Sequence, residues 1–447
     1  TIKLDGNYPT GSNNVALGDG ALDDGSLSGA NNTAIGRQSL TSNTSGEINV
    51  SVGSGALTLN TTGSCNTSTG MQSLYTNTTG ANNTAKGYRA LFSNTTANYN
   101  TAVGSGSLYY NTTGTCNTAV GKSALATNQT GVNLTAVGMN ALLNNTADSN
   151  TSVGFNSMCV NSSGASNTAL GVNALKANTT ASDNVAVGNA ALTTNTTGAS
   201  NTAIGRSALK DNTTASQNTA VGYSALSSNT TALYNTAVGF ESLLTNTTGT
   251  QNTALGRTAL RSSTTSNDNV AVGFAALYTN STGCQNTAVG SCALDSSSTG
   301  NANTAIGYNV LTSNTTGTQN VAVGACALDA NIGAANNTAV GWCTLSSNTT
   351  GEQNTALGSC ALKSATTTNY NIAIGSDALA TTVTGACNIA IGKSALKLNT
   401  ASGNTAIGCA ALEANTSGTS NVAVGLDALT ANTTADNNTG VGSFALC

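Results

Sequence analysis

Residues 201–217 read N-T-A-I-G-R-S-A-L-K-D-N-T-T-A-S-Q, and residues 218–234 read N-T-A-V-G-Y-S-A-L-S-S-N-T-T-A-L-Y. The same pattern returns along the chain, and its first glycine recurs from Gly18 to Gly442. These 26 copies are separated by 25 steps, of which 22 are 17 residues long, two are 16 and one is 18. Such a fixed period is typical of repeat architectures, in which each unit packs against copies of itself.

A 17-residue unit predicts an all-β parallel solenoid, because helical repeats need roughly 33 residues or more for each unit. Two short apolar segments, T-A-V and A-L, are separated by turn residues, and we expect one copy to form one coil, with about 26 coils in all. We number the coil from position 1 (Asn201 in the first quoted copy) to position 17. Residues 14–447 are expected to form one continuous solenoid, and residues 1–13 a lead-in outside the repeat.

Stacking of coils predicts a role for each invariant position. Asn at positions 1 and 12 is expected to form amide ladders, and Gly at position 5 to adopt a backbone conformation that other residues avoid. Leu at position 9 and Val, Ile or Leu at position 4 are expected inside the coil. These structural ladders include Asn201, Gly205 and Leu209 and their counterparts Asn218, Gly222 and Leu226.

The alanines at positions 3 and 8 are small enough to allow a close contact between chains. Each coil offers little apolar surface of its own, so burial between chains would add to its stability. We therefore predict a homo-oligomer, specifically a homotrimer, with an end-to-end filament as the alternative.

The composition excludes several classes of protein. Of 447 residues only 7% are charged and 4% aromatic, with one proline, no histidine and a net charge of −4. This charge offers no footprint for nucleic acid, and no stretch is apolar for long enough to form a membrane helix. Acidic residues are scattered and no nucleophile or phosphate-binding motif is present, so we expect no enzyme activity, cofactor or metal.

The N-T-A-I-G copy at residues 201–205 and the N-V-A-V-G copy at residues 269–273 resemble the repeats of trimeric autotransporter adhesin heads. The longer unit, with A-L and N-T-T-G, also resembles repeats in phage and viral tail-fibre-like proteins. The resemblance covers residues 14–447 and implies a left-handed parallel β-roll in a trimer that binds host surfaces. The unit is longer than the adhesin repeat, so we expect an added segment in each coil. No heptad stalk or membrane-anchor barrel is present, and the sequence starts without a signal peptide and stops within a coil, so we expect a section of a longer fibre.

Positions 6 and 10 carry ten of the 13 basic residues and 11 of the aromatic residues. Such a stripe could stack sugars or contact a partner surface. The alternative is a solvent-facing surface on which basic stems cover a thin core. The candidate binding stripe consists of Tyr88, Phe155, Tyr223, Phe240, Phe274, Tyr308, Trp342, Arg206, Arg257, Lys210 and Arg261.

Asn-Thr-Thr at positions 12–14 matches the acceptor pattern for N-glycosylation. The alternative is a turn ladder without sugar, and an inward asparagine could not be modified. The candidate acceptors are Asn60, Asn77, Asn94, Asn111, Asn178, Asn195, Asn212, Asn229, Asn246, Asn314, Asn348 and Asn432. A regular threonine ridge also suggests ice binding, although adjacent threonines should face opposite ways.

Eleven cysteines are present, and Cys326, Cys343 and Cys360 occupy position 7 in three consecutive coils. A spacing of about 4.8 Å between coils lies within the Cα range of a disulfide. Disulfides between coils or chains are one interpretation, and small half-buried thiols are the other.

Together these features predict a non-enzymatic structural fibre or adhesin shaft that presents a repetitive surface. The alternatives are an ice-binding solenoid and the receptor-binding segment of a virion tail fibre. We expect an extracellular, cell-surface or virion-surface location. The expected partners are further copies of the chain and a cell-surface glycan or receptor.

Overall fold

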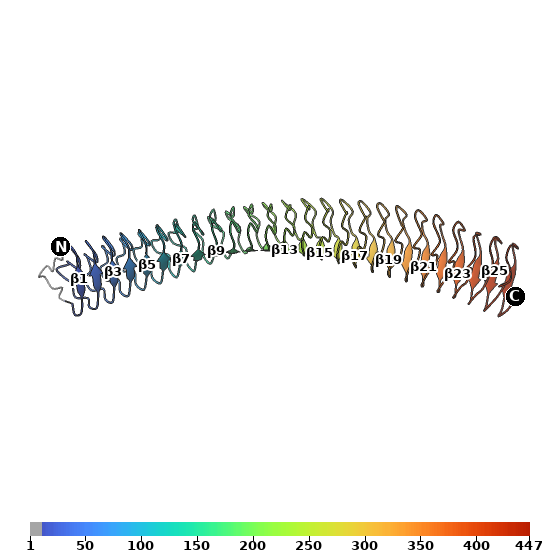
Figure 1. Ribbon diagram of the computed structural model, residues 1–447, viewed down its shortest axis with the longest axis horizontal. Coiled ribbons are helices and arrows are strands. Elements are labelled where there is room, and N and C mark those ends of the chain that lie inside the picture. The colour runs from blue at the N-terminus through green and yellow to red at the C-terminus, as the bar shows by residue number, and fades with distance from the viewer. Residues whose placement is uncertain (1–10) are drawn as a thin grey trace. The chain divides into compact units, whose positions relative to one another are not determined.

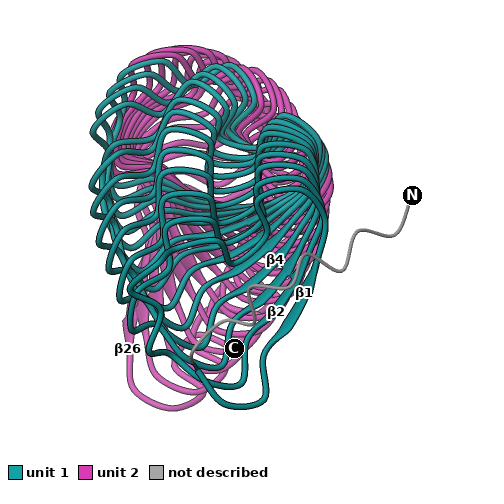
Figure 2. Ribbon diagram, turned by 90° about the vertical axis from the view of Figure 1, so that its left-hand side faces the viewer, with its two compact units in different colours: residues 1–220 teal, residues 221–447 magenta. Residues whose placement is uncertain are grey.

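The computed structural model describes residues 11–447, so residues 1–10 of the expected lead-in lie outside the described part. The chain divides into two compact units, residues 1–220 and 221–447 (Figure 2). The described residues contain no helix, and their regular structure consists of 26 strands of three residues each. Within each unit the coils follow one another in chain order (Figure 1).

The strands of the first unit all fall at positions 2–4 of a coil, and they are β1 (Val15–Leu17), β2 (Thr33–Ile35), β3 (Val50–Val52), β4 (Thr67–Thr69), β5 (Thr84–Lys86), β6 (Thr101–Val103), β7 (Thr118–Val120), β8 (Thr135–Val137), β9 (Thr151–Val153), β10 (Thr168–Leu170), β11 (Val185–Val187) and β12 (Thr202–Ile204). Strand β13 (Thr219–Val221) includes the residues on both sides of the division.

The strands of the second unit occupy the same positions, and they are β14 (Thr236–Val238), β15 (Thr253–Leu255), β16 (Val270–Val272), β17 (Thr287–Val289), β18 (Thr304–Ile306), β19 (Val321–Val323), β20 (Thr338–Val340), β21 (Thr355–Leu357), β22 (Ile372–Ile374), β23 (Ile389–Ile391), β24 (Thr405–Ile407), β25 (Val422–Val424) and β26 (Thr439–Val441).

Neighbouring strands pair in parallel and in register, one coil apart. In the first unit Ala186 of β11 lies opposite Ala203 of β12, and in the second Ala254 of β15 lies opposite Ala271 of β16. The irregular 16-residue step between β8 and β9 preserves this register, since Ala136 still pairs with Ser152. The prediction of a parallel β-solenoid with a 17-residue repeat is therefore confirmed.

The side of the strand that faces the core differs from our expectation. Ala203 at position 3 is fully buried, whereas Ile204 at position 4 is 40% exposed. Successive side chains of a strand point to opposite faces, and the buried Asn201 at position 1 shares the inward side with Ala203. The prediction that position 4 lies inside the coil was wrong.

The coil is too narrow for a large side chain at position 3. In one coil Ser152 at position 3 and Ser157 at position 8 place their hydroxyl oxygens 2.6 Å apart, so these two positions face each other across the interior. Leu209 at position 9 is fully buried and supplies the bulk of the core, as expected. Alanines at positions 3 and 8, such as Ala203 and Ala208, are covered by their own chain. They cannot form the contact between chains that we predicted for them.

Asparagine ladders connect adjacent coils by hydrogen bonds, as predicted. At position 12 the Asn77 amide Nδ2 donates to Asn60 Oδ1 of the preceding coil at 2.7 Å and to the Gly80 carbonyl of its own coil at 2.9 Å. At position 1, Asn201 Oδ1 accepts the backbone N–H of Asn218 at 3.0 Å. These bonds satisfy buried amides that would otherwise each cost about 1–3 kcal/mol.

The A-L segment forms a turn and not a second strand. Its backbone has positive φ at position 7 (Ser207, 58°) and at position 9 (Leu209, 49°). Left-handed φ interrupts the extended conformation of a strand. Gly222 at position 5 has a φ of 139°, and a Cβ there would lie 2.3 Å from the Gly239 carbonyl oxygen, which explains the invariant glycine.

Candidate functional site

The outward face of the strands is a regular surface in each unit. It carries Thr, Val or Ile at position 2 and an aliphatic side chain at position 4 in all strands but two. Leu170 is 47% exposed and Leu255 is 48% exposed on this face, although both were expected in the core. Alternation along the strand was the available signal, because inward Asn at position 1 places positions 2 and 4 outside.

The aromatic and basic stripe is a real surface feature. Its seven aromatic members are all exposed, as are Arg206, Lys210 and Arg257, while Arg261 is half-buried. Rings stack along the coils in both units, with Tyr75 and Phe92 5.4 Å apart and Tyr223 and Phe240 5.2 Å apart between centroids. Lys210 pairs with its neighbour Asp211 at 3.7 Å.

Position 7 connects positions 6 and 10, and the sequence analysis missed this role. Arg89 at position 7 places its guanidinium 5.1 Å from the ring centre of Tyr88 and 5.4 Å from that of Phe92. Glu241 at position 7 accepts a 2.8 Å bond from Arg261 Nε, and this bond raises the pKa of the arginine. Positions 6, 7 and 10 therefore form one face.

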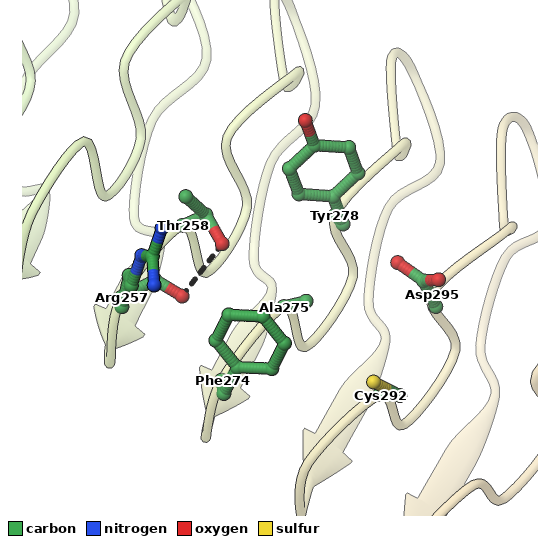
Figure 3. Close-up of a pocket in the computed structure, with 7 residues that line it drawn as sticks. All are labelled: Arg257, Thr258, Phe274, Ala275, Tyr278, Cys292 and Asp295. Carbon is green, nitrogen blue, oxygen red and sulfur yellow. Dashed lines mark hydrogen bonds between the residues drawn. The ribbon is translucent and has the colours of Figure 1, made fainter.

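A pocket interrupts this face in the second unit, with a volume of about 340 Å³. Phe274 and Tyr278 stand on one coil with Ala275 between them, and Cys292 and Asp295 lie on the next coil (Figure 3). Arg257 and Thr258 close the opposite end (Figure 3). Burial raises the pKa of the Asp295 carboxyl. Of these lining residues, Arg257, Phe274 and Tyr278 belong to the basic and aromatic residues that the sequence places at positions 6 and 10.

The Asn-Thr-Thr turns do not present their asparagines to solvent. Asn60, Asn77, Asn94, Asn111, Asn178, Asn195, Asn212, Asn229, Asn246, Asn314 and Asn348 are fully buried, and Asn432 is partly buried with its amide bonded to Asn415 Oδ1 at 3.0 Å. The predicted acceptor ridge is therefore wrong for the folded coil, since a bonded interior amide cannot carry a glycan.

The threonines of the same turns remain at the surface, but not as a pair of free hydroxyls. Thr61 at position 13 donates its hydroxyl to the Thr78 carbonyl at 3.1 Å, while Thr62 at position 14 is exposed. Only one of the two hydroxyl columns is thus available for a ligand or for ordered water.

The cysteines are all free thiols in the structure. Cys326, Cys343 and Cys360 lie half-buried in one column, and burial together with the two neighbouring thiols raises the pKa of Cys343. Bridges between these coils remain a prediction. Across residues 11–447 no three histidine, cysteine or acidic side chains converge as metal ligands.

Comparison with models of known protein families and with curated proteins finds no match for this sequence. None of the described residues belongs to a helix that is long and apolar enough to span a membrane.

Proposed function

We propose that the chain is the body of a non-enzymatic fibre, located outside the cell or on a virion, whose coils pack side by side against other copies. The outward aliphatic column on the strand face carries this proposal. This column includes Leu170, Leu255 and Leu357, which all occupy position 4 and are each nearly half exposed. None of them has a charged residue beside it on its own strand.

The size of this face supports association. In the first unit the twelve strands β1–β12 of three residues each form a strip about 10 Å wide that rises about 4.8 Å per strand, or roughly 600 Å². The thirteen strands β14–β26 form a similar strip in the second unit. The aliphatic column at position 4 makes up part of each strip, beside the side chains of position 2. Apolar patches of a few hundred Å² mark interaction sites. A stable interface buries about 800 Å² on each partner, so each strip would supply most of one such interface.

Light scattering of the purified chain tests the association. We expect a mass of three chains of 43.8 kDa each. Leu255→Lys combined with Leu357→Lys should release monomers without unfolding, because Lys86 already occupies position 4 in β5. Ser227→Lys, at position 10 on the aromatic and basic face, is the matched control and should leave the mass unchanged. A monomer mass for the unmodified chain would refute the proposal.

The strand face also favours a second candidate function, ice binding. Seven consecutive strands, β4–β10, present threonine at position 2, from Thr67 to Thr168, none of them buried. Outward hydroxyls and methyls with a spacing of about 4.8 Å can order water in a lattice, and within these seven strands Lys86 of β5 is the one charge on the face. The Asn-Thr-Thr ridge is the poorer candidate, because its first hydroxyl is bonded to the backbone. Thermal hysteresis in a monodisperse sample tests this function, and freezing without hysteresis would exclude it.

A further inference from the structure

The coil at residues 269–285 combines features found together nowhere else in the chain. It carries aromatic residues at both position 6 (Phe274) and position 10 (Tyr278), with the small Ala275 at position 7 between them. Ala275 is only 8% exposed and forms the floor, while Phe274 is 49% exposed and stands at the rim. The pocket therefore exists because the position between two rings lacks a long side chain (Figure 3).

The first unit shows what fills the same space when a long side chain is present. The coil at residues 83–99 carries Tyr88 and Phe92 at positions 6 and 10, and Arg89 occupies position 7. The Arg89 guanidinium lies within 5.4 Å of both ring centres, and its Nε donates to Gln72 Oε1 at 2.8 Å. A guanidinium held by two rings and an oxygen acceptor is thus a geometry that this coil already accommodates. Both Arg89 and Ala275 have a φ of 53°.

The pocket offers a charged acceptor, Asp295, on the coil after its two rings, whereas the amide of Gln72 lies on the coil before Tyr88 and Phe92. Asp295 lies half-buried on the coil that follows the rings, and its carboxylate makes no hydrogen bond or ion pair with residues 11–447. Burial raises the pKa of this carboxyl, as expected for an acid without a countercharge. A cation seated beside it would recover the solvation that the carboxylate has lost.

The nearest arginines are already engaged on the other side of the rings. Arg261 pairs with Glu241 at 2.8 Å and lies 5.8 Å from the Tyr278 ring centre. Arg257 lies between Phe240 and Phe274, at 5.8 and 5.7 Å from their ring centres. Figure 3 shows Arg257 and Asp295 at opposite ends of the pocket with the two rings between them. The end of the pocket beside Asp295 is therefore the acidic one.

We propose that this pocket binds the guanidinium group of an arginine supplied by a partner, seated between Phe274 and Tyr278 and paired with Asp295. A planar guanidinium can stack on an aromatic face and donate two parallel bonds to one carboxylate, which an ammonium cannot do. The volume of about 340 Å³ suits a single side chain rather than a folded surface. The site is independent of the strand face used for association.

Ligand-observed NMR with the unmodified chain tests the proposal. The probe is N-acetylarginine methylamide, and its uncharged counterpart N-acetylcitrulline methylamide has nearly the same shape. We expect saturable binding of the arginine probe and at least tenfold weaker binding of the citrulline probe. All probes are compared at the same low millimolar concentration. Ethylguanidinium serves as the free small cation. The arginine probe should bind more tightly than ethylguanidinium, because its backbone amides add contacts.

Two variants assign the binding to this pocket. Ala275→Arg should abolish binding, because it recreates the filled arrangement of Tyr88, Arg89 and Phe92. Asp295→Asn should weaken binding at least tenfold. Ser207→Arg places the same residue at position 7 of a coil without the ring pair, and should leave binding unchanged. Thermal unfolding checks that each variant folds.

Three results would overturn the proposal: equal binding of the arginine and citrulline probes, binding that survives Ala275→Arg in a folded protein, or no saturation by the arginine probe. Binding of a methyl glycoside in competition with the arginine probe would instead indicate a saccharide site, and would also count against it. None of these results depends on the number of chains in the assembly.

Discussion

At the scale of single residues, the conformation of the coil depends on a few positions at which the backbone dihedral angles or a buried amide restrict the residue type. Positive φ at positions 7, 9 and 17 recurs with residues as different as Leu, Cys and Tyr. For residues other than glycine this conformation costs about 1–2 kcal/mol each. The coil tolerates the cost because buried leucine and the asparagine ladders hold the turn in place.

Replacement of two neighbouring glycines separates conformational strain from steric exclusion. Gly104→Ala places a Cβ 2.5 Å from the Gly121 carbonyl oxygen at a φ of 135°. We expect a loss of about 3 kcal/mol or more, because this region is essentially restricted to glycine. Gly106→Ala, two residues later at a φ of 65° with no atom nearer than 4.0 Å, should cost only about 1 kcal/mol.

Urea unfolding followed by circular dichroism measures both losses. Equal losses for Gly104→Ala and Gly106→Ala would show that stacking of the glycine column does not restrict position 5.

A gap in the position 12 ladder offers a stabilising substitution. Asn280 Oδ1 and Ser297 Oγ are buried without a hydrogen-bond partner, because serine replaces asparagine in the second of these coils. Ser297→Asn should donate to Asn280 Oδ1, as Asn331 does to Asn314 Oδ1 at 2.7 Å. The gain should be about 1–3 kcal/mol. The reverse change, Asn77→Ser, should destabilise by a similar amount, and a denaturation midpoint that moves the wrong way in either variant would contradict the ladder.

At the scale of the element, one coil interacts only with the coils before and after it. Strand pairing, amide ladders and turn bonds all connect residues about 17 apart, as in Asn201 to Asn218 and Thr61 to Thr78. In such arrays stability is a sum of unit and nearest-neighbour contributions. The fold should therefore tolerate the deletion of a whole coil better than the deletion of part of one.

Deletion of one entire coil tests this modularity. Removal of residues 184–200 joins Asp183 to Asn201 and restores the same register, so the circular dichroism spectrum should be retained with a melting temperature within a few degrees. Removal of residues 184–191 alone would leave only residues 192–200 in that coil, and these nine residues cannot match the coils before and after them. We expect that variant to lose cooperative unfolding, and an intact spectrum for it would show that the register is not essential.

The cysteine column makes a prediction about oxidation. A similar backbone at position 7, with φ of 56°, 50° and 57°, stacks Cys326, Cys343 and Cys360 in adjacent coils. The usual spacing of about 4.8 Å between paired strands lies within the disulfide range of about 4.4–6.8 Å between Cα atoms. The pKa of Cys343 is raised, so less of the reactive thiolate forms near neutral pH. Oxidation should be slow at neutral pH and accelerate under alkaline conditions.

Mass spectrometry of peptides that contain Cys343 would show the loss of two hydrogens when it bridges a neighbour. Cys409, exposed and outside the column, serves as the comparison thiol. A Cys343 that reacts as fast as Cys409 at neutral pH would contradict the effect of burial.

At the scale of the whole molecule, the sequence predicted the fold because the period alone determines what can stack. The sequence did not show which side of each strand faces the core. Hydrophobicity alone would bury Ile204 rather than Ala203, and the sequence does not reveal that the interior is too narrow for the larger side chain. The interior holds only small side chains at position 3, so the larger aliphatic residue lies outside. Likewise, the Asn-Thr-Thr pattern is read as an acceptor site only if the turn faces solvent, and the amide of Asn60 points inward.

The pocket could not be predicted for a different reason. Phe274 and Asp295 are 21 residues apart in the sequence and line the same pocket. Their proximity depends on the 17-residue repeat and also on the direction in which the turn at positions 6–10 points each side chain. Positions 6, 7 and 10 share a face only because the A-L segment is a left-handed turn. The sequence repeat compares equivalent positions in different coils. It does not show which different positions of two adjacent coils, such as Tyr278 and Asp295, lie beside each other.

The in-register pairing of near-identical coils has a consequence for how such a protein can change over generations. A duplication or deletion of seventeen codons inserts or removes one coil and leaves every remaining residue with an equivalent neighbour. Recombination between similar copies produces such events readily. Coil number is therefore a heritable trait that can be lengthened or shortened while the chemistry of each retained surface is preserved.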